Sequence, residues 1–197
     1  MIEVEKKFIL TEEQEKALIH NAEFLGEKIF TDIYYDDSNY SLTKKDIWLR
    51  DRAGSFGLKI PMNESIEIRV LDRYKEFEND EEILKYFGAS TDINLIDFIN
   101  EKGYKPFCKF TTTRRKYKKE GFNIDLDAAD FGYNMAEIEF MTNDDLTLQQ
   151  VTDSIIKFAE KHNIPSSGYS VRGKVLKYLE LNNKEHLQAL IDAKVIK

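Results

Sequence analysis

The sequence predicts an α+β protein built around an antiparallel sheet, and two observations lead to this fold class. Most of the chain alternates between apolar and polar residues with the period of a strand, and amphipathic helical segments lie between and after these stretches. Glycines such as Gly54, Gly121 and Gly132 separate the strands, and no linker rich in proline or glycine divides the chain. A length of 197 residues fits one domain, and we expect residues 1–197 to form it.

Eight segments have strand periodicity, and the residues that flank them favour turns. They are residues 2–8, 30–37, 46–52, 56–60, 66–77, 107–119, 122–128 and 133–141. Two helices are predicted by their N-caps, which are Thr11 and Asn79, each followed by acidic residues. Apolar residues at helical spacing predict a third helix at about 146–162. Further helical segments at 171–181 and 184–193 complete the C-terminal end.

The composition excludes several classes of protein. The net charge of −7 makes the chain a poor candidate for sequence-independent nucleic-acid binding. The single cysteine, Cys108, excludes an internal disulfide framework and a cysteine-based zinc cluster, and we expect it to be a small buried hydrophobe. No apolar run approaches the roughly 18 residues of a membrane span, and the acidic N-terminus is unlike a signal peptide. We therefore expect a cytoplasmic protein without nucleic-acid or membrane partners, with its three histidines, His20, His162 and His186, at the surface.

Carboxylate pairs at positions i and i+2 recur in the predicted strands, and alternation places both members of a pair on the same face. The pairs are Glu3/Glu5, Asp125/Asp127 and Glu137/Glu139. Like charges at this spacing repel each other unless a cation lies between them. Arg50 and Arg52 repeat the arrangement with the opposite sign, and Trp48 shares their face.

Two interpretations of these charged faces are open. In the first, the sheet has a solvated polar face and an apolar face that packs against helices. In the second, which we favour, the sheet curls into a barrel whose interior holds the charges and whose apolar exterior lies beneath helices. The uniform sign of each pair supports it, because a surface that serves only solubility intersperses the two signs. Basic walls suit a polyphosphate and acidic walls suit Mg²⁺ or Mn²⁺, so a metal-bound polyphosphate would need both.

The segment Glu3-Val4-Glu5-Lys6-Lys7 resembles the ExExK signature of the CYTH superfamily, the triphosphate tunnel metalloenzymes. Further segments support the resemblance in chain order: Tyr34-Tyr35-Asp36, Trp48-Leu49-Arg50-Asp51-Arg52, Leu58-Lys59, Tyr74-Lys75-Glu76, Arg114-Arg115, Asp125 to Tyr133, Glu137-Ile138-Glu139 and Lys174. The stretch from Asp125 to Tyr133 is most similar to the branch that hydrolyses thiamine triphosphate. The resemblance runs from Ile2 to about Leu179 and diverges around residues 60–72.

The resemblance implies a closed, eight-stranded antiparallel β-barrel that encloses a tunnel, with helices packed outside, and Mg²⁺-dependent hydrolysis of thiamine triphosphate to thiamine diphosphate and phosphate. A closed barrel exposes no strand edge, so we expect a monomer. The implied metal ligands are Glu3, Glu5, Asp125, Glu137 and Glu139. The implied ligands of the triphosphate are Lys7, Arg50, Arg52, Lys59, Arg115 and Lys174, and Glu76, Asp127 and Glu137 would line the substrate.

Three further roles follow from the resemblance and from strand parity. Trp48 would stack on the cationic ring of thiamine, a contact that contributes roughly 0.5–2 kcal/mol. Tyr34 and Lys59 would form a catalytic dyad in which the ammonium favours the phenolate. Arg114 has the opposite parity to Arg115, and we expect it to be solvated.

Three alternatives to this function remain open from the sequence. The same tunnel could hydrolyse inorganic tripolyphosphate or a nucleoside triphosphate. An adenylate cyclase is disfavoured, because the resemblance is strongest to the thiamine branch. A polyphosphate-binding module without catalysis would bind triphosphate and Mg²⁺ but release no phosphate.

Overall fold

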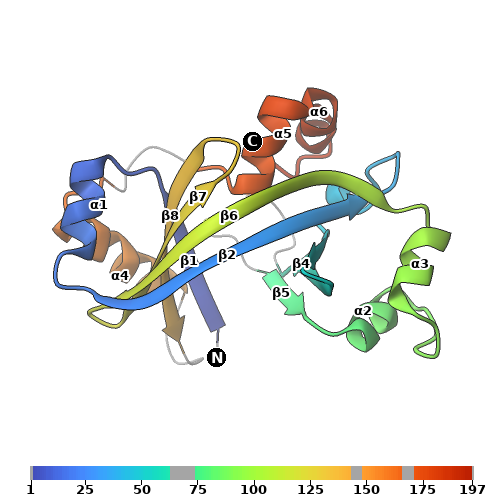
Figure 1. The fold of residues 1–197 in the computed structure, drawn as a ribbon, viewed down its shortest axis with the longest axis horizontal. Helices are drawn as coiled ribbons and strands as arrows, with labels where there is room; N and C mark the ends of the chain where they lie inside the picture. The colour runs from blue at the N-terminus through green and yellow to red at the C-terminus, as the bar shows by residue number, and fades with distance from the viewer. Residues whose placement is uncertain (1, 63–73, 143–147, 166–170, 197) are drawn as a thin grey trace. The chain divides into compact units, whose positions relative to one another are not determined.

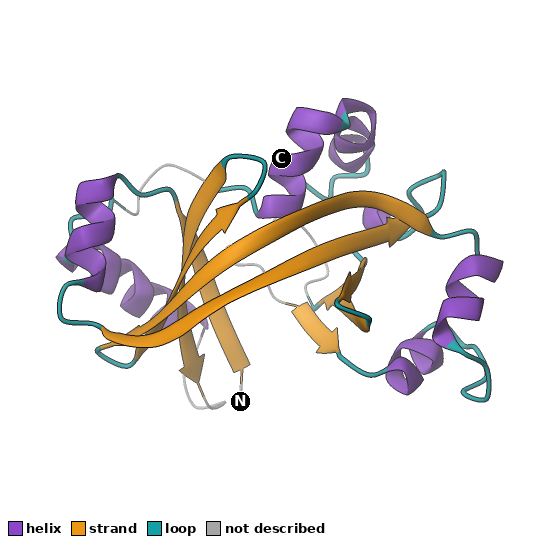
Figure 2. Cartoon of the chain, in the orientation of Figure 1, coloured by secondary structure: helices purple, strands orange, loops and turns teal. Residues whose placement is uncertain are grey.

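The computed structural model describes residues 2–62, 74–142, 148–165 and 171–196, and within them it contains eight strands and six α-helices (Figures 1 and 2). The strands are β1 (Ile2–Phe8), β2 (Glu23–Asp36), β3 (Trp48–Arg52), β4 (Ser55–Pro61), β5 (Tyr74–Phe77), β6 (Lys105–Lys119), β7 (Phe122–Ala129) and β8 (Tyr133–Thr142). The helices are α1 (Glu12–Ile19), α2 (Asp80–Tyr86), α3 (Leu95–Glu101), α4 (Leu148–Lys161), α5 (Lys174–Asn182) and α6 (Lys184–Asp192), with a 3₁₀ helix η1 at Thr43–Lys45. The predicted α+β class is confirmed.

The eight strands form one sheet in the order β1-β8-β7-β6-β2-β3-β4-β5. The pairs β1·β8, β7·β8, β6·β7, β2·β3, β3·β4 and β4·β5 are antiparallel, as predicted. The order has β1 at one end and β5 at the other, so it does not establish closure, and the closed barrel stays a prediction. Most strand boundaries lie within two residues of the expectation, with two larger differences. Strand β2 begins at Glu23 rather than at residue 30, and most of the strand predicted at 66–77 lies outside the described residues.

The chain forms two compact units that are interleaved in the sequence. Unit 1 contains the described residues of Met1–Ile29 and Thr112–Lys174, and unit 2 those of Phe30–Arg69, Arg73–Thr111 and Val175–Lys197. Each unit has its own apolar core. Whether residues 1–197 act as a single domain stays a prediction.

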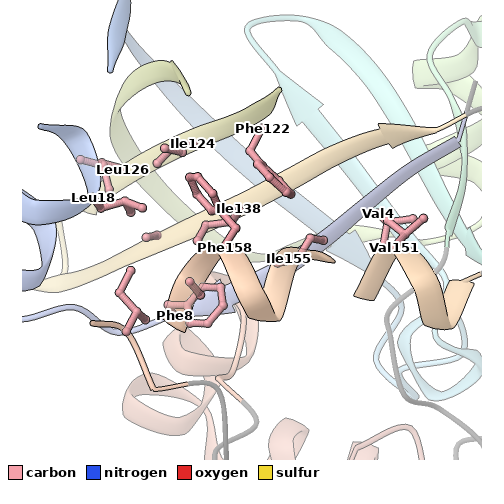
Figure 3. Close-up of a cluster of buried hydrophobic side chains, with 13 residues drawn as sticks. Val4, Phe8, Leu18, Phe122, Ile124, Leu126, Ile138, Val151, Ile155 and Phe158 are labelled. Atoms are coloured by element: carbon pink, nitrogen blue, oxygen red, sulfur yellow. The ribbon is translucent and has the colours of Figure 1, made fainter. Parts of the chain in front are cut away.

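The core of unit 1 lies between the apolar face of its strands and two helices (Figure 3). Helix α4 carries the predicted stripe of Val151, Ile155 and Phe158, and the ring of Phe158 stacks on Phe122 of β7 with their centroids 4.3 Å apart. Helix α1 begins with the predicted cap, since the Thr11 side chain accepts a hydrogen bond from the Gln14 N–H. The expectation that helices cover the apolar face is thus confirmed for this unit.

The cores of unit 2 pack on the sheet in two clusters. In the first, Leu49 of β3 and Leu58 of β4 are paired in register and pack with apolar residues of α2 and α3. Helix α3 was not predicted, although Asn94 caps it by accepting a hydrogen bond from the Ile96 N–H. In the second cluster, residues of α5 and α6 pack around Trp48. The described residues contain no helix that combines the length and the apolar character needed to cross a membrane.

Two expectations about buried polar groups have different outcomes. Cys108 is buried, as predicted. His186 of α6 was expected at the surface, and this expectation is wrong, because its exposed fraction is 0%. Its ring stacks on Tyr40 with the centroids 3.9 Å apart, and its Nε2 lies 2.7 Å from the hydroxyl of Thr43. His20 is exposed, as predicted.

The contacts of Thr43 fix the tautomer of His186. The Thr43 hydroxyl donates to the carboxylate of Asp36 at 2.7 Å, so its oxygen must accept the proton of His186 Nε2. The Nδ1 atom is buried and has no hydrogen-bond partner among the described residues. Burial lowers the pKa of His186 from 6.5 to about 4, while Asp36 raises it and Lys44 lowers it.

We predict that His186 makes the folded protein less stable as the pH falls from about 6.5 to about 4. Folding favours the neutral imidazole, so its contribution is present above the unfolded pKa and is lost on acidification, by about 3 kcal/mol in total. Urea unfolding of the wild type and of His186→Gln, at several pH values, measures the difference. The glutamine variant keeps a donor for Thr43 but does not titrate, so its stability should fall less steeply. The variant of the exposed His20, His20→Gln, should follow the wild type, and parallel curves for wild type and His186→Gln would contradict the assignment.

Candidate functional site

The strand register of unit 1 places charged residues side by side on one face of the sheet. Lys7 of β1 is opposite Glu137 of β8, Glu137 is opposite Asp125 of β7, and Asp125 is opposite Lys116 of β6. Directly opposite residues of antiparallel strands project from the same face. These four residues therefore form a row across all four strands, with a cation at each end and two carboxylates in the middle.

The carboxylates of this face are almost fully removed from water. Asp125, Asp127, Glu137 and Glu139 are each at most 7% exposed. The interpretation in which the charged face is solvated is therefore wrong for unit 1. Buried carboxylates cost free energy unless cations and hydrogen bonds compensate them, so the cations around them are essential to the fold.

Arg114 of β6 compensates three of these carboxylates at once. Its guanidinium donates to both oxygens of Asp127, at 2.6 and 2.7 Å, and to Glu137 at 2.6 Å, and it forms an ion pair with Asp125. Lys174, the first residue of α5, pairs with Asp127 and lies 4.0 Å from Glu137. Burial alone would lower the pKa of Arg114, but its hydrogen bond to Asp127 and the nearby charge of Glu137 raise it above its ordinary value. We call Arg114, Asp125, Asp127, Glu137 and Lys174 the Arg114 cluster.

The assignment of Arg115, rather than Arg114, to the charged face is wrong. Arg114 is opposite Asp127 in register, whereas Arg115 is opposite Leu126, which belongs to the apolar face. Arg115 accordingly donates to Glu15 of α1 at 2.9 Å. The expected solvation of Arg114 is wrong for the same reason.

Three carboxylates of unit 1 lie close enough together to share a cation. Oxygen atoms of Glu5, Glu137 and Glu139 all lie within 4.8 Å of one another. We call them the acidic group. Glu5 and Glu139 are opposite each other in register, and Glu5 also pairs with Lys7. A set of oxygen donors without nitrogen or sulfur, two of them buried, fits a hard cation such as Mg²⁺ or Mn²⁺.

The two other predicted metal ligands have different outcomes. Asp125 lies beside Glu137 in register, but Arg114 and Lys116 pair with its carboxylate, and it is not part of the acidic group. Burial raises the pKa of Asp125, against the lowering effect of the two cations. Glu3 belongs to β1, but its side chain lies outside the described part of the structure.

Unit 2 carries the arginines predicted from the sequence. Arg52 forms a two-pronged contact with Asp32 of β2, at 2.6 and 2.8 Å, and its guanidinium lies 3.9 Å from the centre of the Phe30 ring. Asp32, which the sequence analysis missed, is 1% exposed and is opposite Arg52 in register. Asp32 is two residues before Tyr34 in β2 and therefore lies on the same strand face, and this alternation is the pattern from which the sequence could have identified it.

Arg50 differs from Arg52 because its positive charge is less completely compensated by neighbouring carboxylates. Its Nε lies 3.8 Å from Asp32 and has no hydrogen-bond partner among the described residues. Gly57 is opposite Arg50, and a Cβ atom there would lie 3.4 Å from Arg50 Nη2. The absent side chain at Gly57 thus gives the guanidinium its space, and an anion could satisfy the remaining donor.

The Tyr34–Lys59 dyad stays a prediction, and two features of the structure disfavour it. Lys59 pairs with Glu76 at 2.6 Å and is opposite Trp48 in register, whereas Tyr34 is opposite Arg50. Burial, followed by the charge of Asp32, raises the pKa of Tyr34 above its ordinary value. A phenol with a raised pKa is not a general base at neutral pH.

Trp48 is on the same strand face as Arg50 but is packed into the second core cluster of unit 2. It is 8% exposed and its indole N–H donates to Asp46 at 2.8 Å. The ring of Tyr34 meets it edge-on with the centroids 6.4 Å apart. Its stacking on a ligand stays a prediction.

Comparison with known proteins identifies relatives over nearly the whole chain. The family described as the CYTH domain matches residues 1–173, which ends just before α5. The thiamine-triphosphatases of Macaca fascicularis and Homo sapiens are each 26% identical, over 211 and 212 residues, which cover 98% of this chain and 90% of each relative. A solved structure from Pyrococcus horikoshii OT3 has a TM-score of 0.59 at 22% identity and covers 91% of this chain and 98% of its own. A Hippeastrum protein, for which a dominant triphosphatase activity is described, has a TM-score of 0.62 at 16% identity over 91% of this chain and 95% of its own. The two structures support the fold alone.

We predict that Arg114 and Arg115, although adjacent, differ in their contribution to stability. Arg114→Met leaves buried carboxylates without their cation, which should lower the free energy of unfolding by about 3–5 kcal/mol. Arg115→Met removes a partly exposed pair with Glu15, which should cost less than about 1 kcal/mol. Urea unfolding at pH 7 measures both variants, and equal losses would contradict the face assignment.

Proposed function

The chain belongs to the CYTH family, and from this premise we propose that it is a Mg²⁺-dependent triphosphatase whose substrate is thiamine triphosphate. One observation carries the proposal: unit 1 brings the acidic group together with the cations Lys7, Arg114 and Lys174. Hydrolysis of a triphosphate needs both signs of charge, a cation-binding set of carboxylates and basic groups for the phosphates. The names of the two mammalian relatives support thiamine triphosphate as the substrate.

We assign the metal to the acidic group, with Glu3 and Asp125 as further ligands expected from the family resemblance. When bound, the ion would offset the charge that develops on the phosphate oxygens. Mn²⁺ could take the same oxygen ligands.

Following the family resemblance, we propose two sets of basic residues as phosphate ligands, one set in each unit. In unit 1 these are Lys7, Arg114 and Lys174, with Arg114 in the role first given to Arg115. In unit 2 they are Arg50, Arg52 and Lys59. Asp127, Glu137 and Glu76 pair with these cations and hold their side chains in place before substrate arrives.

The reaction would need no covalent intermediate. The fixed cations neutralise the phosphate oxygens and align the triphosphate, so that water attacks the terminal phosphorus opposite the leaving oxygen of thiamine diphosphate. Tyr34 takes no proton in this scheme, because its pKa is raised. We also propose that the protein is a cytoplasmic monomer that binds neither nucleic acid nor membrane, and the net charge of −7 supports the absence of a nucleic-acid partner.

One observation favours a second candidate, inorganic tripolyphosphate. Trp48 is 8% exposed, so little of its ring is open for stacking on an organic group. An enzyme that binds only the phosphate chain would not need that ring as a contact surface.

We predict that Arg52→Ala and Glu139→Ala each reduce phosphate release about a hundredfold, since one lost charge contact at the transition state costs on the order of 3 kcal/mol. Phosphate release at saturating Mg²⁺ is the measurement, with circular dichroism to check folding. Matched controls are Lys109→Ala and Glu23→Ala, which remove exposed charges and should retain activity. Wild-type activity in Arg52→Ala or Glu139→Ala would contradict the site.

We predict that Trp48→Ala raises KM for thiamine triphosphate at least about tenfold more than KM for tripolyphosphate, because only thiamine offers a cationic ring, whose contact is worth up to roughly 2 kcal/mol. The wild type and the variant are compared on thiamine triphosphate, tripolyphosphate and ATP, with and without Mg²⁺. Equal effects on the first two substrates would favour the tripolyphosphatase. Binding of triphosphate without phosphate release from any substrate would show a binding module instead.

A further inference from the structure

We infer that Asp46 is a positioning residue that fixes the indole ring of Trp48 and, through it, the preference for a triphosphate with an organic group. The effect on substrate preference rests on the proposed function, whereas the effect on the ring does not. Asp46 lies two residues before Trp48, and it is not among the residues that the family resemblance singles out.

One oxygen of Asp46 joins two aromatic side chains. Its Oδ1 accepts the indole N–H of Trp48 at 2.8 Å and the hydroxyl of Tyr74 at 2.9 Å. Trp48 begins β3 and Tyr74 begins β5, so the carboxylate connects two strands of unit 2. Asp46 is buried, and hydrogen bonds to a buried carboxylate are stronger than those between neutral groups. The indole edge is therefore held in one place.

The backbone at Asp46 explains why a small polar residue occupies this position. Asp46 ends the 3₁₀ helix η1 in the left-handed conformation, with φ 61° and ψ 27°, and its N–H donates to the carbonyl of Thr43. Among residues with a side chain, Asp and Asn enter this conformation most readily. Asp46 thus combines the required turn with the acceptor that Trp48 and Tyr74 need.

The loop that carries Asp46 is itself anchored at two points. Asp36, at the end of β2, accepts hydrogen bonds from the N–H groups of Leu42 and Thr43, at 3.0 and 2.8 Å, and from the Thr43 hydroxyl. His186 of α6 donates to the same hydroxyl. These contacts hold η1 against α6, so the packing of unit 2 fixes the position of Asp46.

The ring that Asp46 holds lies on the same strand face as side chains of its own unit that we propose as phosphate ligands. Trp48, Arg50 and Lys59 project from the same face of β3 and β4, since Trp48 and Lys59 are opposite each other in register. Tripolyphosphate has no group that could contact an aromatic ring. Moving the ring should therefore affect an organic triphosphate and leave tripolyphosphate almost unaffected.

The test compares Asp46→Gly with Asp46→Asn. Glycine accepts the left-handed backbone but removes the acceptor, whereas asparagine keeps both the backbone and an acceptor oxygen. Trp48 is the only tryptophan, so intrinsic fluorescence reports on this ring alone. We expect Asp46→Gly to shift the emission maximum and to raise the ratio of KM for thiamine triphosphate to KM for tripolyphosphate at least about fivefold, as loss of a buried hydrogen bond allows. Asp46→Asn should resemble the wild type in both measurements.

Two further measurements keep the inference falsifiable if Asp46→Gly fails to fold. The single indole N–H of the wild type gives one NMR signal, which should exchange slowly with solvent, and rapid exchange would overturn the inference. Tyr74→Phe removes a second donor to Asp46 and should leave the emission of Trp48 unchanged.

The outcomes separate this inference from the proposed function. A wild type that cleaves tripolyphosphate but not thiamine triphosphate overturns the proposed substrate, and the fluorescence comparison still decides the role of Asp46. Wild-type fluorescence in Asp46→Gly overturns the positioning role whatever the substrate. A shifted emission with an unchanged ratio of KM values overturns the link to substrate preference.

Discussion

The structure depends on how unit 1 compensates the like charges that it buries on one face of a sheet. Asp125, Asp127 and Glu137 are almost fully removed from water, and their mutual repulsion would be unfavourable without a cation between them. A single guanidinium, that of Arg114, contacts all three. Because the planar fork of an arginine holds two oxygens at defined positions, the carboxylates are oriented as well as neutralised.

The same arrangement links the acidic group to the basic side chains of the Arg114 cluster. Glu137 belongs both to the Arg114 cluster and to the acidic group, so a displacement of Arg114 would also displace the oxygens that lie near Glu5 and Glu139. The opposite face of these strands is packed against α4, which restricts the backbone that carries them. Charges fixed before the substrate arrives need little reorganisation during the reaction, which is the main way a site of this kind can lower a barrier.

The features of the structure that follow from a local sequence pattern could be predicted from the sequence. The features that follow from pairing across the sheet could not. The Thr11 cap and the apolar stripe of α4 are local features, and both are confirmed. Arg114 and Arg115 are adjacent and chemically alike, so only the register with Asp127 on β7 shows which one joins the carboxylates. His186 was placed at the surface because its partners, Asp36 and Thr43, are distant in sequence and no local pattern connects them with α6.

Under the proposed function, the choice between an organic and an inorganic triphosphate depends on which part of Trp48 a ligand can reach. The face of an aromatic ring attracts a cation, whereas its edge is electropositive and does not. In Trp48 the N–H edge is directed to Asp46, and the ring packs among apolar residues of α5 and α6. These helices lie beyond the segment that matches the family, whereas Tyr34 and Phe107, which also pack against this cluster, lie within it. Under the proposed function, a change in α5 or α6 that moves the ring would alter substrate preference while the charged faces of the sheet stay as they are.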